Sequence, residues 1–359
     1  MCVLALALLL VLPGCSRLRR FHHKQHEMVY VWARHMYLRD RVAVVSNHVA
    51  QVANGEALEV LEHGRRWLRV KTASGATGWI PERAVIDAKA YAVFAELAAR
   101  HKDDPTVATA TLRDDIYLHA NPGRDTDRFY LLPGNEKVQM LVRVSVPRRL
   151  PGTPAVLQPA KPGAEEPAVP MEDWWLIRDA QGHTGWALGS RVDPDVPLDV
   201  AQYAEGQRIV GAYVLARVHD DEADMPNHEA PEYVTALATP KSGLPYDFDE
   251  IRVFTWSLKH HRYETAYRIH PILGYLPVRI TSEPGPNGTT EPVFSFQIST
   301  SPDVSINADT GIAKPIAPRT LSFALRDTSV RRVGPDTAPI PILHTADEKP
   351  KPSAKKKHR

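Results

Sequence analysis

Histidines and acidic residues in the last third of the chain are the side chains that could hold a metal. His260, His261 and Glu264 are close in sequence, and His270 follows them. Imidazole nitrogens and carboxylate oxygens are common zinc ligands. The segment nevertheless alternates like a turn followed by a strand, and the H-E-x-x-H pattern, which aligns two histidines on one helix face, is absent. The sequence therefore predicts neither a catalytic metal nor any other cofactor.

Groups for acid–base or nucleophilic catalysis are equally sparse. Asp247, Asp249 and Glu250 could pair their carboxylates, but they precede an apolar strand and have the composition of a turn. A mature chain beginning at Cys15 would lose Cys2 and keep a single thiol, without an internal disulfide. The G-x-S-x-G, Walker A and dinucleotide-binding glycine motifs are missing. We expect a protein that is not an enzyme; the alternative is an envelope hydrolase, a cell-wall amidase or peptidase, with its site in the C-terminal domain.

The N-terminal residues have the pattern of an export signal. Residues 3–12 are apolar, a run too short to span a bilayer, and Pro13-Gly14-Cys15 follows. L-P-G-C resembles the lipobox of bacterial lipoproteins, which implies a signal peptide over 1–15, a lipidated Cys15 (palmitate) and a membrane anchor. A plain secretory signal, or an apolar helix with an incidental cysteine, are the alternatives. Residues 16–29 form a basic linker suited to anionic headgroups.

Length and charge narrow the class of partner. A chain of 359 residues predicts two to three domains, and its net charge of +2 provides no global field for nucleic acid. We expect a protein of the cell envelope, anchored to a membrane and facing the periplasm or the exterior, with no nucleic-acid partner.

One tryptophan-rich segment occurs twice. The first copy runs from Trp67 to Trp79, and the second from Trp175 to Trp186; each has an apolar run, a glycine turn and T-G-W. Upstream matches pair Tyr37-Leu38 with Tyr117-Leu118, and the stretch from Gly55 to Val60 with that from Gly134 to Val138. Short apolar strands between glycine turns indicate a small antiparallel barrel in each copy.

The fold class that follows is mainly β. We expect two tandem SH3-like barrels joined by a short helix, and a C-terminal antiparallel β-sandwich or barrel. The predicted divisions are barrel 1 at 30–88, a connector helix at 89–105, barrel 2 at 106–194 with a proline-rich insertion at 146–171, a β-rich C-terminal domain at 195–335, and a disordered basic tail at 336–359.

The repeated modules resemble the bacterial SH3 (SH3b) domain. The matching features are a leucine strand at Leu38, a G-E-x-x-x-V-L strand from Gly55, a tryptophan strand at Trp67 and a closing Gly78-Trp79, each with a counterpart in the second copy. More broadly, the chain resembles uncharacterised bacterial SH3-domain lipoproteins that combine tandem modules with a C-terminal β-domain. This resemblance implies an envelope setting and binding of peptidoglycan peptides or partner proteins.

The tryptophans divide into structural and ligand-contact candidates. Trp67, Trp79, Trp175 and Trp186 recur at matched positions, and large aromatics in so small a barrel favour the core. If Trp175 packs inward like Trp67, its neighbour Trp174 faces outward, where the first copy has Arg66. The ligand-binding candidates are Trp174, Tyr37, Tyr117 and Arg66. We therefore expect a non-catalytic protein that binds peptidoglycan or envelope proteins through shallow aromatic and basic surfaces.

Overall fold

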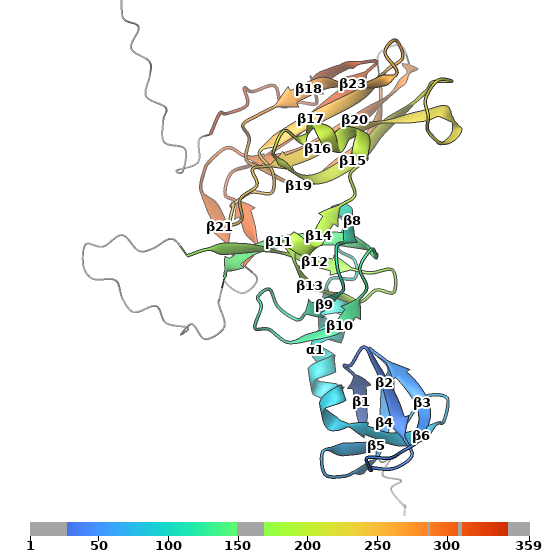
Figure 1. The fold of residues 1–359 in the computed structure, drawn as a ribbon. Coiled ribbons are helices and arrows are strands. Elements are labelled where there is room, and N and C mark those ends of the chain that lie inside the picture. Colours follow the sequence, from blue (N-terminus) through green and yellow to red (C-terminus); the bar gives the residue numbers. More distant parts are fainter. Residues whose placement is uncertain (1–26, 149–168, 286–287, 308–310, 344–359) are drawn as a thin grey trace, which may run out of the picture.

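The computed structural model describes residues 27–148, 169–285, 288–307 and 311–343. The protein is mainly β, as the sequence predicts, with several antiparallel sheets and two short α-helices among the described residues. Figure 1 shows three parts following one another along the molecule: a small barrel (blue), a second barrel (green) and a larger sandwich (yellow to red). Neither described helix has the length and apolarity needed to span a membrane.

Barrel 1 is a seven-stranded antiparallel sheet with strand order β3-β2-β6-β5-β4-β1-β7. A 3-10 turn, η1 (Glu82–Ala84), separates its last two strands. The core is aliphatic, with Leu38, Leu58 and Ile80 at its centre. The strands are β1 (Met28–Val31), β2 (His35–Arg39), β3 (His48–Ala53), β4 (Ala57–His63), β5 (Trp67–Lys71), β6 (Thr77–Pro81) and β7 (Val85–Asp87).

Barrel 2 repeats that topology strand for strand, with the order β10-β9-β13-β12-β11-β8-β14 and a 3-10 turn, η2 (Gly189–Arg191), at the same place. Its core is larger and aromatic, and includes Phe129 and Trp175. The strands are β8 (Ala108–Leu112), β9 (Ile116–His119), β10 (Arg128–Leu132), β11 (Lys137–Pro147), β12 (Met171–Arg178), β13 (Thr184–Leu188) and β14 (Val192–Pro194).

A shared close contact explains the repeated Gly-Trp pair. A Cβ on Gly78 would lie 2.8 Å from Leu38 Cβ, and one on Gly185 would lie 2.7 Å from Leu118 Cβ. Real Cβ atoms do not approach that closely, so only glycine lets β6 and β13 cross the leucine strand here. The leucine strand and the Gly-Trp strand are therefore matched to each other in both barrels.

The helix α1 (Ala88–Arg100) belongs to barrel 2 as much as to the connection. Its first turn is capped by Asp87, whose side chain accepts from the Ala90 N–H at 2.7 Å. Phe94 lies in the barrel 2 core, and Leu97 packs on the outside of the same barrel. The helix predicted at 89–105 is thus shorter, and it fills a core instead of spacing two modules apart.

Stacked rings and one asparagine join the two barrels. Tyr30 stacks on Tyr91 with ring centroids 3.6 Å apart, and Trp32 stacks on Tyr117 at 5.4 Å. Asn54 lies in barrel 1 but bonds to the backbone of β10: its amide donates to the Phe129 carbonyl at 3.0 Å and accepts from the Leu131 N–H at 2.8 Å. These contacts give barrel 1 a defined orientation on barrel 2.

The C-terminal part is a sandwich of two four-stranded antiparallel sheets, ordered β15-β16-β17-β18 and β19-β20-β23-β24. Between them lies a core in which Phe294, Phe296 and Phe323 stack. Preceding the sheets are α2 (Leu198–Ala201) and a 3-10 turn, η3 (Gln202–Ala204). The strands are β15 (Arg208–His219), β16 (Glu229–Ala238), β17 (Glu250–Ser257), β18 (Arg262–Ile269), β19 (Gly274–Pro284), β20 (Thr290–Ser299), β23 (Pro318–Arg326) and β24 (Ser329–Val333), with a 3-10 turn, η4 (Pro226–His228), ahead of β16.

A small ribbon from the sandwich reaches barrel 2. It consists of β21 (Val304–Ile306) and β22 (Ala313–Pro315), which lie beside β11 in Figure 1. Ile312, immediately before β22, packs against the outer face of barrel 2. Nearby, Arg143 of β11 is 6% exposed in its side chain and binds Asp173 at 3.2 Å and Asp247 at 2.9 Å. The sandwich and barrel 2 therefore share both an apolar and an ionic contact.

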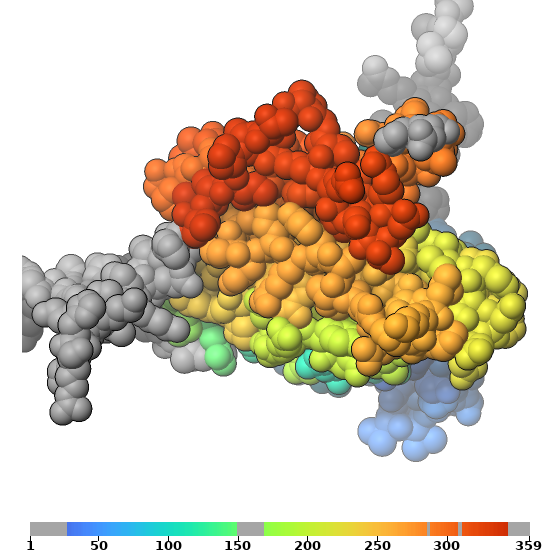
Figure 2. Space-filling view, turned by 90° about the horizontal axis from the view of Figure 1, so that it is seen from above, coloured from blue at the N-terminus to red at the C-terminus, as the bar shows by residue number. Residues whose placement is uncertain are grey.

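The end of the sandwich lies beyond the predicted boundary at 335. Arg319 donates to Asp336 Oδ1 and to the Pro339 carbonyl, both at 2.8 Å, and Ile340 packs on the sandwich core. The first residues assigned to a free tail are thus held by the fold. Figure 2 shows this last described segment (red) lying over the orange strands. The predicted signal peptide with Cys15, most of the basic linker and proline-rich insertion, and residues 344–359 fall outside the described residues.

Candidate functional site

A shallow groove of about 660 Å³ lies on the outer face of barrel 1. Adjacent strands β2, β5 and β6 and the turn η1 form it, since Arg39 pairs with Trp79 and Trp67 pairs with Pro81 in the sheet. We call it the barrel 1 groove. Its lining residues are Met36, Arg39, Arg66, Trp67, Pro81, Glu82 and Arg83.

The indole of Trp67 forms the floor of the groove, and an arginine lies over it. The Arg39 guanidinium carbon is 5.4 Å from the centre of the Trp67 ring, within the range of a cation–π contact. Trp67 begins β5, so its neighbour Leu68 points into the core while the indole stays on the outer face. The groove therefore presents an aromatic surface with a cation held against it.

The charge of the groove is positive. Arg39, Arg66 and Arg83 line it together with one acid, Glu82. None of these three arginines makes an ion pair with any residue that the structure describes. Arg66 has φ 62°, and its carbonyl accepts from the Glu82 N–H at 3.1 Å, which ties the β4–β5 turn to η1. This surface fits a ligand that carries carboxylates beside an apolar or planar group.

The predicted ligand residues separate into different environments. Arg66 lines the groove. Tyr37 is exposed on the neighbouring part of β2 and stacks on His48, with ring centroids 4.2 Å apart. Tyr117 is engaged at the barrel junction, between Trp32 and the Arg128 guanidinium, which lies 5.3 Å from its ring. The structure thus places Arg66 and Tyr37 on the open surface of barrel 1 and Tyr117 away from it.

The expectation of an exposed Trp174 is wrong. This side chain is 2% exposed and lies in an apolar cluster with Trp186 and Leu176. The outer face of barrel 2 does receive Trp174, as alternation requires, but Leu97 of α1 and Ile312 of the sandwich ribbon cover that face. The indole N–H has no hydrogen-bond partner among the described residues, and the contacts of Trp174 are apolar and aromatic.

The repeat pairs the tryptophans differently from the sequence prediction. Trp67 pairs with Pro81, two residues after Trp79, and Trp174 pairs with Leu188, two residues after Trp186. Trp67 therefore corresponds to Trp174, and Leu68 corresponds to the core residue Trp175. The prediction that Trp67 and Trp79 are core residues is also corrected: both are half-buried and lie outside the aliphatic core of barrel 1.

The corresponding surface of barrel 2 differs from the barrel 1 groove in its chemistry, and it is also covered by other segments. The counterpart of Arg39 is His119, because both pair with the tryptophan of the T-G-W strand. Burial, followed by the charge of Arg128, lowers the pKa of His119, so its imidazole is neutral at pH 7. His119 meets Trp174 edge-on, with centroids 5.0 Å apart. Barrel 2 thus has a closed, neutral version of the open, cationic barrel 1 groove.

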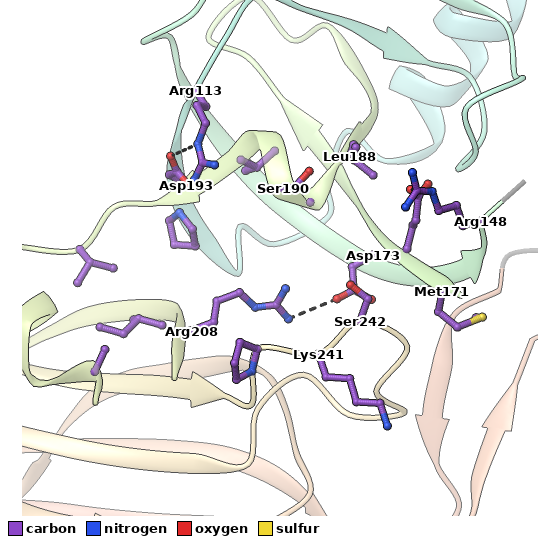
Figure 3. A pocket seen from close by; sticks show the side chains of 18 of the residues that line it. Arg113, Arg148, Met171, Asp173, Leu188, Ser190, Asp193, Arg208, Lys241 and Ser242 are labelled. Carbon is purple, nitrogen blue, oxygen red and sulfur yellow. Dashed lines mark hydrogen bonds and ion pairs between the residues drawn. The ribbon is translucent and has the colours of Figure 1, made fainter. Parts of the chain in front are cut away.

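A second cleft, of about 760 Å³, lies between barrel 2 and the sandwich. Figure 3 shows its arginines paired with carboxylates: Arg113 donates to Asp193 and Arg208 to Asp173. Glu172, on the same strand, binds Arg124 at 2.7 Å. Because each carboxylate that lines this cleft already holds an arginine, the arrangement joins two domains and provides no free general base.

The histidines of the sandwich form separate pairs. His260 bonds to Glu264 and His261 to Asp220, each at 2.8 Å. His270 lies near Glu250 instead, with 3.8 Å between the ring and the carboxylate. Within the ranges that the structure covers, no three histidine, cysteine or acidic side chains meet as a metal site.

Most of the barrel 1 groove was not foreseen from sequence. Arg39, Pro81 and Arg83 are ordinary surface residues in the sequence, and they become neighbours through the pairing of β2, β5 and β6. A usable signal existed for Arg39, which follows the predicted candidate Tyr37 by two residues and so shares its face of the strand.

Comparison with known proteins adds one finding for this barrel. No curated protein matches the chain. Among solved structures, NlpC2 from Trichomonas vaginalis has 8% identity and a TM-score of 0.16, covering 57% of this chain and 62% of that one, so the chain spans less than two thirds of its length. NlpC1 from the same organism has 6% identity and a TM-score of 0.16, with 68% and 88% covered. Scores this low do not indicate a shared fold. Residues 35–87, which contain the whole barrel 1 groove, match the model of the Bacterial SH3 domain.

Proposed function

We propose that the protein is a non-catalytic lipoprotein of the cell envelope, anchored through Cys15, whose first barrel binds the cell wall or envelope proteins. The observation that carries this proposal is the open barrel 1 groove, with Arg39 over Trp67, inside the segment that matches the Bacterial SH3 domain. Bacterial SH3 domains commonly bind peptidoglycan or other cell-wall components, which supports the same assignment.

The chemistry of the groove favours peptidoglycan stem peptides as the ligand. These peptides carry free carboxylates on short aliphatic side chains. Arginines recognise carboxylates through paired N–H donors, and the Trp67 face offers apolar contact beside them. The equivalent face of barrel 2 is already covered by the chain itself. Barrel 2 therefore has a supporting role, and barrel 1 binds the ligand. Binding through one shallow groove is weak by itself, and a membrane anchor raises the effective concentration of the groove near the wall.

A pulldown on purified peptidoglycan sacculi tests the proposal. We expect Arg39→Glu to lower retention on the order of tenfold, because it removes the cation–π contact and reverses the charge at the groove floor. Lys89→Glu is the matched control, since it makes the same charge change at an exposed position on α1. Equal retention of wild-type protein and a Trp67→Ala/Arg39→Glu double variant would remove the cell-wall ligand from consideration.

A second measurement separates wall from protein partners. A photo-crosslinking residue in place of Arg66, which lines the groove, reports what the groove touches in intact cells. Crosslinks to muropeptides support the wall ligand, whereas a single crosslinked protein band with no muropeptide assigns the groove to an envelope protein partner.

A further inference from the structure

The loop between β2 and β3 has an apolar tip that no described residue covers. Val44 is fully exposed, Val45 is 84% exposed and Val42 is 49% exposed. Single exposed hydrophobes are normal on protein surfaces, but three within one short loop form a local patch. Residues 40–47 contain no strand or helix, so the valines are presented on a turn that projects from barrel 1. We call these residues the valine loop.

The base of this loop is held by several hydrogen bonds. The Asp40 N–H donates to the Asn47 carbonyl at 3.1 Å. In return, the backbone and side-chain N–H groups of Asn47 donate to the two carboxylate oxygens of Asp40, each at 3.0 Å. The loop therefore presents its valines from a fixed base, and their exposure does not result from a frayed strand end.

The loop lies at the end of barrel 1 where the N-terminal chain enters β1. Met28 of β1 pairs with Glu59, Glu59 with Lys71, and Lys71 with Thr77. Arg39 pairs with Trp79 on the same strand, so β2 runs toward Thr77 as it enters the loop. The valine loop and the start of β1 consequently emerge at the same end of barrel 1.

The chain that precedes β1 is short. Only the linker after Cys15 separates that residue from Met28, and a fully extended chain spans at most about 3.5 Å per residue. A barrel tethered at Cys15 therefore stays on the order of 45 Å or less from its attachment point. Arg41 beside the valines and the basic linker both suit a surface of anionic headgroups.

We propose that the valine loop is a membrane-contact element, which inserts Val44 and Val45 into the interface of an anionic bilayer and so orients barrel 1. A lipid surface is the occupant that fits, because the patch is a convex loop tip and lacks the concave shape that receives a protein side chain. This inference depends on the proposed membrane attachment only because the anchor brings barrel 1 to the bilayer. With one face of the barrel at the lipid, the barrel 1 groove is held at a constant angle to the surface.

A site-specific fluorescent probe tests the contact. The lipidated protein carries Val44→Cys labelled with nitrobenzoxadiazole; processing removes Cys2 and the lipid blocks the Cys15 thiol, so position 44 holds the free thiol. It is reconstituted through the lipid on Cys15 into vesicles of phosphatidylethanolamine and phosphatidylglycerol. We expect a blue shift, a severalfold rise in emission and quenching by doxyl-labelled lipids. The matched control is Val93→Cys on α1, also an exposed valine, which should show none of these.

Three results would overturn the proposal. The first is unchanged emission at position 44 while the chain sediments with the vesicles. The second is an equal response at positions 44 and 93. The third is a blue shift without lipid that rises with protein concentration, which would assign the tip to contacts between copies of the chain.

An unlabelled variant separates this proposal from the groove. Val44→Asp/Val45→Asp should lose the lipid contact, seen as protease access to the loop on vesicles, and should keep wild-type retention on sacculi. If Arg39→Glu fails to change sacculus retention while the probe at position 44 still enters lipid, the groove assignment fails and the membrane contact stands.

Discussion

Trp67 and Trp174 occupy the same position in two successive barrels, yet one lines an open groove and the other is 2% exposed. Each lies on the strand that pairs with the T-G-W strand, and each points to the outer face of its barrel. The difference arises outside the barrel. Leu97 and Ile312 reach Trp174 from α1 and from the sandwich ribbon, and no described segment does the same for Trp67.

This pair gives a direct contrast between stability and binding. Trp174→Ala should lower the free energy of unfolding by about 3–5 kcal/mol, because it leaves a cavity under a covered face. Trp67→Ala should cost far less stability, about 1 kcal/mol, and instead reduce retention on sacculi. Urea unfolding followed by circular dichroism measures the stability of both alanine variants. Trp174→Phe is the control, since it keeps most of the apolar area and removes an unpaired N–H. Equal losses of stability for the two alanine variants would contradict the assignment of different roles.

The repeated close approach of glycine to leucine predicts parallel effects in the two barrels. Gly78→Ala and Gly185→Ala each place a methyl group under 3 Å from a leucine Cβ and should cost about 1–3 kcal/mol of stability. Thr77→Ala, at the exposed neighbouring position, should change it by less than about 0.5 kcal/mol. Chemical denaturation measures all three. A neutral Gly78→Ala would mean that β2 and β6 can separate without loss, against the pairing seen in both sheets.

The sequence predicts the strands and the two barrels better than it predicts which segments cover which faces. Strand alternation and the T-G-W repeat predicted two like barrels, because apolar periodicity is a local property of the chain. The pairing of Trp67 with Trp175 was wrong, since a Trp-Trp dipeptide leaves the register ambiguous. The spacing to the closing tryptophan resolves it: Trp67 lies as far ahead of Trp79 as Trp174 lies ahead of Trp186.

Other features depend on contacts between distant segments. The burial of Trp174 requires Ile312, which belongs to a ribbon far along the chain, so no local pattern could predict it. By contrast, Leu321, Phe323 and Leu325 of β23 alternate in the sequence, and all three lie in the sandwich core. Arg83 carries no such signal, because exposed charged residues occur on every protein surface.

Arg143 provides a test of the contact between barrel 2 and the sandwich. Its buried guanidinium binds Asp173, Asp247 and the Leu244 carbonyl, the last at 3.0 Å. Arg143→Met should cost about 3–5 kcal/mol, because it leaves Asp247 without its cation in a covered interface, and Asp173 with only the Arg208 contact at 3.3 Å. Arg113→Met, which breaks an exposed pair with Asp193, should cost less than about 1 kcal/mol. Calorimetry measures both, and we expect the Arg143 variant to separate the sandwich transition from that of barrel 2. A single unchanged transition would show that the apolar contact suffices.

Glu232 predicts how the stability of the sandwich depends on pH. Its side chain is covered within β16 and accepts from the Trp256 N–H at 3.2 Å. Burial raises the pKa of Glu232 to about 7, and the hydrogen bond from Trp256 offsets only part of that effect. Because the folded-state pKa lies above the unfolded value, the unfolded chain releases this proton first as the pH rises.

Stability should therefore fall between about pH 4.5 and 7 and then stay level, by up to about 3 kcal/mol for this one group. The measurement is the free energy of unfolding of wild type minus that of Glu232→Gln across this range, which cancels the titration of the His261–Asp220 pair. We expect the difference to become steadily less favourable to the wild type as the pH rises, because glutamine keeps an uncharged side chain at every pH. A difference that is flat, or that rises with pH, would mean that Glu232 is ionised in the folded protein with a normal or lowered pKa, and that water or an unrecognised cation reaches it within the sandwich.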